Sequence, residues 1–288
     1  MLFMNVVPKK IVQFKLPNKK RLNRDLAIFR RYFNPEFYGL GNINENTPHL
    51  YIGNHTIYGF IDSPLIFNGL YQHKNVLLRS MVDTLHFKIP FWGRLLTKYG
   101  ALVGTRDNCD ALMQAGEDIL VYPGGAREVA KRKGELYTLT WKERTGFVRM
   151  AIEHGYNIMP FASLGADEVY SILYDGDEFK RSFVGRKLLK TKFINSNLRG
   201  GDTFMPLVRG LGLSVIPRPE KFYFMFGKPI STKEYAGRGG DERVLFELRD
   251  KVADSVESIL EELKEIREKD KTSLLRRLLI KKKATLNN

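Results

Sequence analysis

The sequence predicts an α/β fold, a mixed and largely parallel sheet flanked by helices, and three observations support it. Short apolar runs with the length of buried strands alternate with longer helix-like stretches along most of the chain. Glycine or proline separates many of these runs, as expected at the ends of strands and helices. The last regular segment, 244–266, repeats apolar residues at steps of three and four, the pattern of an amphipathic helix.

In the first part of the chain, proline and glycine residues mark the ends of several predicted elements. Pro48 precedes a buried apolar strand, Pro90 and Gly100 stand at the start and end of a helix, and Gly116 ends the next one. The elements expected here are a helix at 25–33, a strand at 49–53, a helix at 62–71, a strand at 76–81, a helix at 90–99, a strand at 101–104 and a helix at 108–115.

In the second part, an apolar strand runs directly into a Pro-Gly-Gly turn, and a helix precedes the next strand. Residues 175–219 have a weaker pattern with scattered glycine, proline and basic residues, which predicts a lid or an elaborated loop region. The elements expected here are a strand at 118–122, a helix at 143–153, strands at 157–161 and 221–227, and the final helix at 244–266.

The positive charge of the chain is concentrated at its two ends. The 288 residues carry a formal charge of +15, and residues 1–31 and 269–288 together hold +14 of it. We therefore expect a basic N-terminal segment (1–31), one nearly neutral domain (32–268) and a basic amphipathic C-terminal tail (269–288). Nucleic-acid binding is not expected, because the domain is neutral and the basic segments lack interleaved aromatic residues.

Composition excludes several classes of protein. The single cysteine, Cys109, excludes a disulfide scaffold within one chain and a cysteine-based zinc cluster, and no metal site is expected. No run approaches the roughly 20 apolar residues of a membrane-spanning helix, and residues 1–7 are too short for the core of a signal peptide. Nucleotide-binding glycine motifs and the Gly-x-Ser-x-Gly motif of serine hydrolases are also missing.

His55 stands where α/β proteins place catalytic groups, in the turn between a buried strand and a helix. An imidazole acts as a general base when an acceptor on one ring nitrogen fixes its tautomer, and Asp62 follows seven residues later. A continuous helix would separate the two by about 10.5 Å, so they can meet only if the chain folds back, as Gly59 would permit. A structural histidine beside an N-cap aspartate is the simpler interpretation of this pattern alone.

A second motif, Tyr122-Pro123-Gly124-Gly125-Ala126-Arg127-Glu128, follows a predicted strand. Its glycines would expose backbone N–H groups at the sheet edge, and Arg127 could join Arg106 of the Gly104-Thr105-Arg106 motif in binding phosphate. Such a loop suits an anionic ligand or a developing oxyanion. The alternative is an ordinary strand-to-helix turn with surface arginines.

These motifs, in this order, resemble the glycerolipid acyltransferases related to lysophosphatidic acid acyltransferase, and especially the branch of phytyl ester synthases and diacylglycerol acyltransferases. Residues 53–62 resemble the family's His–Asp block, 104–106 its second block, 122–128 its third block and 158–161 its fourth, and the resemblance extends from residue 50 to 227. It implies a lysophosphatidate acyltransferase-like fold over 32–268. It also implies substrate-binding roles for Gly104, Thr105, Arg106, Tyr122, Pro123, Gly124, Gly125, Arg127, Glu128 and Pro160.

The resemblance implies that His55 takes the proton of a lipid hydroxyl as that oxygen attacks the thioester of acyl-CoA or acyl-carrier protein, while Asp62 orients the ring. No other cofactor is implied. Six residues separate His55 from Asp62 where the broad family has four, and Gly124 replaces the usual glutamate of the third block. The second departure favours a neutral acceptor, such as diacylglycerol or a long-chain alcohol. The alternatives are a lysophospholipid (1-acylglycerol-3-phosphate) acyltransferase and a non-catalytic membrane- or lipid-binding relative.

The C-terminal tail interleaves leucines with cations between residues 274 and 283. As a helix it would lie in the interface of an anionic membrane, and the alternative is a solvated terminus. We therefore expect a peripheral membrane protein at the cytoplasmic face, with an anionic membrane surface, a lipid acceptor and an acyl thioester as its partners.

Overall fold

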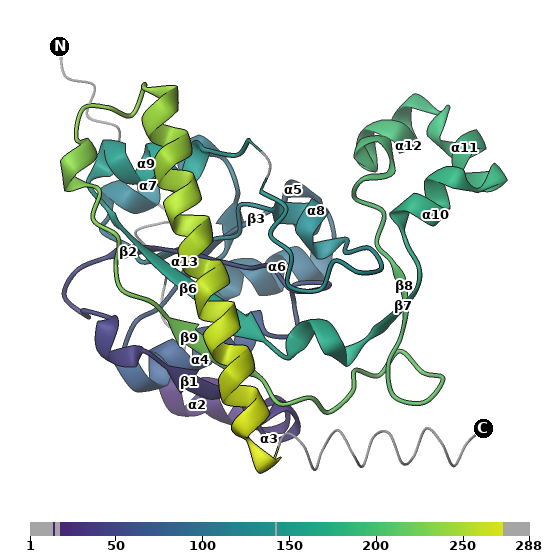
Figure 1. The fold of residues 1–288 in the computed structure, drawn as a ribbon, viewed down its shortest axis with the longest axis horizontal. Helices are drawn as coiled ribbons and strands as arrows, with labels where there is room; N and C mark the ends of the chain where they lie inside the picture. Colours follow the sequence, from purple (N-terminus) through teal and green to yellow (C-terminus); the bar gives the residue numbers. More distant parts are fainter. Residues whose placement is uncertain (1–13, 15–17, 142, 273–288) are drawn as a thin grey trace.

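The computed structural model describes residues 14, 18–141 and 143–272, and its centre is a seven-stranded sheet in the order β1-β9-β6-β2-β5-β3-β4 (Figure 1). Neighbouring strands are parallel except for β6 and β9. The strands are β1 (Glu36–Tyr38), β2 (His49–Gly53), β3 (Arg79–Val82), β4 (Leu102–Val103), β5 (Ile119–Val121), β6 (Asn157–Leu164) and β9 (Tyr223–Phe226). The predicted mixed, largely parallel sheet flanked by helices is confirmed.

Helices cover both faces of this sheet, because alternate residues of its strands point to opposite sides. On one face Leu50 packs in a cluster with α7, α9 and α13, and on the other Tyr51 packs with α3 and α4. The helices outside the 175–219 region are α2 (Lys19–Asp25), α3 (Ala27–Phe33), α4 (Ser63–Lys74), α5 (Thr84–Phe87), α6 (Pro90–Lys98), α7 (Arg106–Gln114), α8 (Gly125–Val129), α9 (Gly146–His154) and α13 (Glu242–Lys269).

The 175–219 region contains more regular structure than its sequence pattern predicts. It holds α10 (Gly176–Arg181), α11 (Phe183–Leu189) and α12 (Lys192–Asn197), carried on an antiparallel ribbon of β7 (Ser171–Tyr174) and β8 (Leu207–Arg209). Figure 1 shows this unit projecting away from the central sheet. Each helix has seven residues or fewer, too short for a 3.6-residue period to be visible in the sequence. Capping by Asp175 and Ser182 sets where α10 and α11 begin.

Parts of both basic ends pack against the domain. In the N-terminal segment, α2 buries Leu22, and the Lys19 ammonium lies 4.9 Å from the centre of the Tyr71 ring on α4. The predictions for residues 1–13 and 15–17, and for the amphipathic part of the tail from residue 273, concern residues outside the described ones. Within residues 14, 18–141 and 143–272, no helix is long and apolar enough to span a membrane.

A buried ion cluster joins the start of the tail to the edge of the sheet. Lys221, whose side chain is 4% exposed, donates to Glu36 of β1 and to Asp270 just after α13, each at 2.5 Å. The Tyr223 hydroxyl also donates to Asp270, at 2.7 Å. These hydrogen bonds lower the pKa of Asp270 despite its partial burial. The end of α13 is therefore fixed to strands β1 and β9.

We predict that Asp270→Ala lowers the free energy of unfolding by about 2 kcal/mol at pH 7, because it leaves the Lys221 ammonium buried with one carboxylate partner. Urea denaturation measures the change, and Asp254→Ala on the exposed face of α13 is the control. The difference in unfolding free energy between the wild-type and Asp270→Ala proteins shrinks below about pH 4. There the unfolded state of the wild-type protein binds a proton at Asp270 more readily than the folded state does. Equal effects of the two substitutions would contradict this role for the cluster.

Candidate active site

His55 lies in the loop between β2 and α4, at the carboxyl edge of the sheet. Its half-buried ring stacks on that of Tyr122, with the centroids 3.9 Å apart and the planes 8° from parallel. Tyr122 directly follows β5, which is the parallel neighbour of β2. Because parallel neighbours end at the same edge, the first and third sequence motifs are in contact.

The loop after His55 reverses direction at Gly59, the residue expected from the sequence to permit it. Gly59 has a left-handed backbone with φ of 64°, and its N–H donates to the Thr56 carbonyl at 3.0 Å. A β-carbon on Gly59 would lie 2.2 Å from Cε1 of His55, so only glycine fits against the imidazole. The reversal brings Asp62 back to the start of the loop, where its Oδ1 accepts a hydrogen bond from the Thr56 hydroxyl at 2.9 Å.

Asp62 is completely buried at the start of α4 and links the loop to β6. Its second oxygen, Oδ2, accepts a hydrogen bond from the Ser163 hydroxyl at 2.8 Å. No hydrogen bond joins Asp62 to His55, and Nδ1 of His55 is buried without a partner. Burial raises the pKa of Asp62 to about 6, although both hydroxyl hydrogen bonds oppose the shift. Asp62 therefore anchors the loop, and its predicted role in orienting the imidazole stays a prediction.

The surroundings of His55 favour its neutral form. Burial lowers the pKa of His55 to about 3, and the positive charge of Lys131 acts in the same direction. At neutral pH the ring is therefore an uncharged imidazole with a lone pair available for a proton.

Two buried carboxylates hold the backbone of the His55 loop. The N–H of His55 donates to Oε1 of Glu128 on α8 at 2.8 Å, and the N–H of Ile57 donates to Oδ1 of Asp167 at 2.6 Å. Lys131 pairs with the second of these carboxylates, with its Nζ 3.3 Å from Oδ2 of Asp167. Glu128, Lys131 and Asp167 are almost completely buried. Burial raises the pKa of Glu128 to about 7, against the opposing effect of Lys131.

The structure explains why position 124 is glycine. A β-carbon on Gly124 would lie 1.7 Å from Oε2 of Glu128, so the Glu128 carboxyl group occupies the space next to this residue. The two positions are one helical turn apart at the start of α8. The side chain that would clash is buried and bonded to His55, and it cannot move without releasing the histidine loop.

The other predicted oxyanion donor, Gly125, uses its N–H within the turn, donating to the Tyr122 carbonyl at 3.0 Å. The Pro123 carbonyl accepts a hydrogen bond from Arg144, a residue that the sequence patterns do not single out. The third motif is therefore a tightly bonded turn at the sheet edge. The stabilisation of an oxyanion by Gly124 and Gly125 stays a prediction.

The two predicted phosphate-binding arginines are both paired with glutamates. Arg127 is buried, and its Nη1 donates to Glu135 at 2.9 Å. Arg106 is exposed, and its Nη2 contacts both carboxylate oxygens of Glu153 on α9 at 2.9 to 3.0 Å. Both guanidinium groups are therefore already paired with a carboxylate, and neither is free to bind a phosphate in this structure.

The remaining predicted site residues have structural contacts. Gly104 donates its N–H to the Val82 carbonyl at 2.8 Å, and Thr105 caps α7 by accepting from the N–H of Asn108. Pro160 lies within β6, level with Ile52 of β2. No interaction of these residues with the His55 loop is seen in the part of the chain that the structure describes.

Sequence patterns missed several residues that build this site. Thr56, Ser163, Lys131 and Asp167 hold the loop, yet Ser163 lies 101 residues beyond Asp62 in the chain. Only the pairing of β6 with β2 brings such distant positions together, and no motif spacing indicates it.

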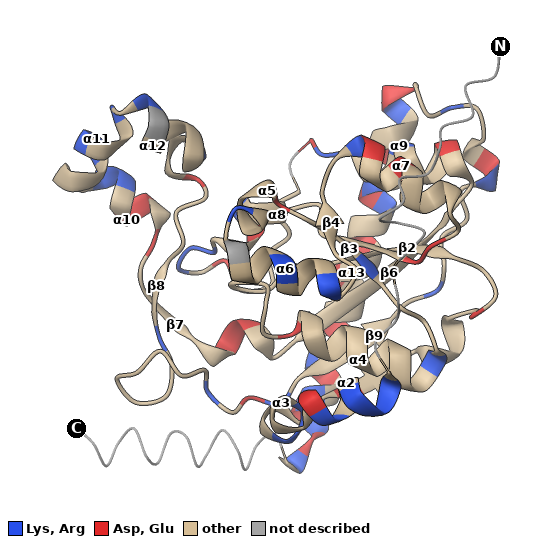
Figure 2. Ribbon diagram, turned by 180° about the vertical axis from the view of Figure 1, so that it is seen from behind, with Lys and Arg blue, Asp and Glu red and all other residues tan. Residues whose placement is uncertain are grey.

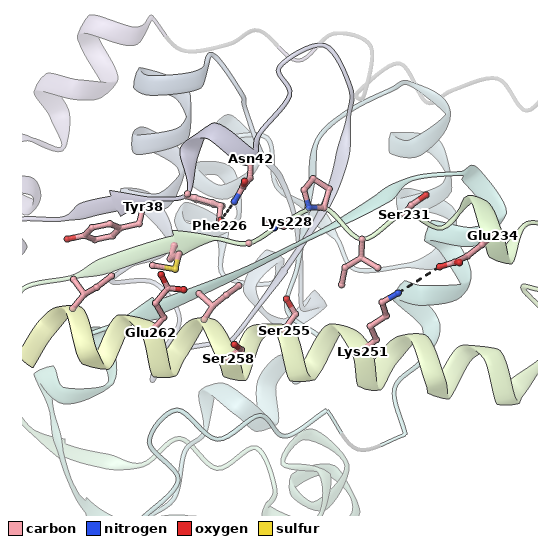
Figure 3. A pocket seen from close by; sticks show the side chains of 17 residues that line it. Tyr38, Asn42, Phe226, Lys228, Ser231, Glu234, Lys251, Ser255, Ser258 and Glu262 are labelled. Atoms are coloured by element: carbon pink, nitrogen blue, oxygen red, sulfur yellow. Dashed lines mark hydrogen bonds and ion pairs between the residues drawn. The ribbon is translucent and has the colours of Figure 1, made fainter.

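A separate hollow of about 870 Å³ lies between β9 and α13 (Figure 3). Polar side chains line it from α13 and from the segment that follows β9, among them Lys228, Ser231, Ser255 and Glu262. None of its lining residues belongs to the four sequence motifs, so this hollow is not part of the candidate active site.

Comparisons with known proteins agree with the motifs. A family model described as "Acyltransferase" matches residues 34–164. Phytyl ester synthase 2, chloroplastic, of Arabidopsis thaliana is 32% identical over 233 residues, which cover 77% of this chain and 33% of that protein. Phytyl ester synthase 1, chloroplastic, of the same plant is 30% identical, covering 68% of this chain and 29% of that protein. The chain thus spans about a third of the length of these plant relatives.

Two further proteins are similar over different shares of the chain. The human "DGAT1/2-independent enzyme synthesizing storage lipids" is 32% identical over 158 residues, 52% of this chain and 47% of that protein. The crystal structure of the 1-acyl-sn-glycerophosphate acyltransferase PlsC from Thermotoga maritima aligns with a TM-score of 0.48 and 14% identity, over 90% of this chain and 87% of that one. The family model covers all four motifs. Together with the plant relatives it makes this chain a member of the acyltransferase family in the glycerolipid acyltransferase superfamily.

Proposed function

We propose that this protein transfers a fatty acyl group from acyl-CoA or acyl-carrier protein to the hydroxyl of a neutral lipid, such as diacylglycerol or a long-chain alcohol. The observation that carries the proposal is the state of His55. It is a half-buried, uncharged imidazole at the carboxyl edge of the sheet, fixed by backbone and ring contacts, in a chain of the acyltransferase family.

In the proposed reaction, Nε2 of His55 accepts the proton of the acceptor hydroxyl while the oxygen of that hydroxyl attacks the thioester carbonyl. The tetrahedral intermediate then collapses, its C–S bond breaks, and the thiolate takes the proton from the imidazolium. Nδ1 is the ring nitrogen that would donate to Asp62, and it is the one that lacks a partner here. The proposal therefore requires that substrate binding bring Nδ1 of His55 to the Asp62 carboxylate, whose oxygens accept from Thr56 and Ser163 here.

The arginine contacts favour a neutral acceptor. Both motif arginines are ion-paired with glutamates, and the carboxyl group of Glu128 lies beside Gly124. A phosphorylated acceptor at this edge would therefore find no unpaired motif arginine to neutralise its charge. Assays with diacylglycerol, long-chain alcohols and lysophosphatidate in parallel distinguish this proposal from a lysophospholipid acyltransferase. Faster transfer to lysophosphatidate would contradict it.

We also propose peripheral attachment at the cytoplasmic face of a membrane, through the basic ends. The supporting observation is that residues 1–31 and 269–288 hold +14 of the +15 charge. Attraction to anionic lipid contributes about 1 kcal/mol for each basic residue near the surface.

We predict that His55→Ala lowers kcat for acyl transfer by about 10²- to 10⁴-fold, the range expected when a general base is lost. Mass spectrometry of the acylated product with purified protein measures the rate. His73→Ala, on the exposed end of α4, should retain activity. Circular dichroism checks that both variants are folded. Unchanged transfer by a folded His55→Ala protein would exclude the proposed mechanism.

We predict that Gly124→Ala lowers kcat at least tenfold, because the new methyl group displaces the Glu128 carboxyl group from the N–H of His55. Gly146→Ala is the matched control, since a methyl group at the start of α9 meets no atom within 4 Å. The same activity assay compares the two proteins. Equal activity would show that the contact between Gly124 and Glu128 does not position His55.

We predict that His55 stays neutral from pH 8 down to pH 4.5 in the folded protein, because burial lowers its pKa to about 3. NMR of histidine ring carbons measures this, with the His55→Asn spectrum identifying the resonance. In denaturant the same residue should titrate near pH 6.5. Since only the unfolded state binds this proton readily, His55 reduces stability as pH falls from about 6.5 towards 3. A folded-state midpoint near 6.5 would refute the prediction.

A further inference from the structure

The unit formed by α10, α11 and α12 exposes an unusual number of apolar side chains. On α11, Phe183 is 73% exposed, Val184 is 61% exposed and Leu188 is 38% exposed. Gly185 is the buried residue of this helix, because it packs against the Phe179 carbonyl, where a β-carbon would lie 1.8 Å away. Close backbone packing through glycine leaves the larger apolar residues of α11 directed outward.

Beyond Asp177 and Glu178 at the start of α10, this unit is strongly cationic. Residues 179–199 contain seven Lys and Arg residues and no Asp or Glu, and Figure 2 shows basic residues along these helices. Lys180 pairs with Asp202, and Arg199 pairs with Asp83. The other five are exposed, with no carboxylate partner among the described residues: Arg181, Arg186, Lys187, Lys190 and Lys192.

This unit is firmly attached to both loops of the candidate active site. Arg132, just beyond the third motif, pairs with Asp177 and Asp202 at 3.0 Å. The ammonium of Lys133, the next residue, donates a hydrogen bond to Glu178 at 2.7 Å. The Tyr58 hydroxyl, in the His55 loop, donates to the carbonyl that precedes β8 at 2.6 Å. Because α11 is fixed relative to His55, anything that binds to α11 would also lie in a fixed position relative to His55.

We propose that α11, with the adjoining ends of α10 and α12, is a membrane-docking surface for anionic bilayers. Phe183, Val184 and Leu188 enter the interface, and the unpaired cations contact the lipid headgroups. A projecting tip that is both apolar and cationic matches this partner, since nucleic acid would satisfy the cations and leave the apolar side chains in water. This surface is separate from the chain ends, and its binding does not depend on catalytic activity.

A fluorescent label at the tip tests insertion directly. The one native cysteine, Cys109, is buried, so full-length Val184→Cys protein can be labelled selectively with an environment-sensitive nitrobenzoxadiazole group. Vesicles of phosphatidylcholine and phosphatidylglycerol (7:3) should increase its emission severalfold and shift it to shorter wavelength. A label on Lys233→Cys, at an exposed position, should not respond. An unresponsive label at 184, whether or not the protein sediments with vesicles, would overturn the proposal.

Substitutions of the cations and the apolar residues provide the second test. Lys187→Gln/Lys190→Gln should weaken partitioning onto the same vesicles about 25-fold, or about fivefold for each cation. Lys233→Gln/Arg243→Gln removes the same charge from exposed positions elsewhere and should change it less than threefold. Phe183→Ser/Val184→Ser should weaken it at least tenfold, with the melting temperature retained. Equal losses of vesicle binding in Lys187→Gln/Lys190→Gln and Lys233→Gln/Arg243→Gln would refute the proposal. So would a Lys187→Gln/Lys190→Gln protein that binds duplex DNA more weakly but binds vesicles as the wild type does.

Discussion

The candidate active site depends on the hydrogen bonds that hold the buried loop between β2 and α4. Backbone N–H groups removed from water need acceptors, and here carboxylates from distant segments supply them. Glu128 accepts from the N–H of His55, and Asp167 accepts from the N–H of Ile57. Asn54 exchanges two hydrogen bonds with the backbone of Ser163, whose hydroxyl binds Asp62. The position of His55 is therefore determined jointly by β6, by α8 and by the segment after β6.

These anchors also determine the electrostatics of the site. Buried carboxylates are costly to keep ionised, and the pKa values of Asp62, Glu128 and Asp167 are raised, mainly by burial. Lys131 partly offsets this cost for Glu128 and Asp167, and the same positive charge disfavours protonation of His55. One buried cation thus stabilises the carboxylates that hold the loop and keeps the imidazole neutral. A neutral imidazole is the form that a general base requires.

Sequence patterns predict the parts of this structure that rest on long, uniform signals. The strands at 49–53 and 157–161 are continuous apolar runs because helices cover both faces of the sheet. The reversal that brings Asp62 back beside the His55 loop follows from a glycine between them. In contrast, β1 has three residues and gives no run, and the pairing of Asp62 with Ser163 follows from tertiary structure alone.

Charge averaged over a domain conceals its distribution in space. Residues 32–268 have a net charge of +1, which indicated a neutral body, yet residues 179–199 within them carry +7 and the rest therefore carries −6. This positive segment is the outer part of the projecting unit beyond β7 and β8 (Figure 2). The four acids of the unit, Asp175, Asp177, Glu178 and Asp202, reduce the net charge of residues 175–206 as a whole to +3. In the proposed docking, an anionic surface attracts the unpaired cations of this outer part, which would orient the domain as well as bind it. In the proposed reaction, such an orientation would present the acceptor hydroxyl to His55 from the bilayer side.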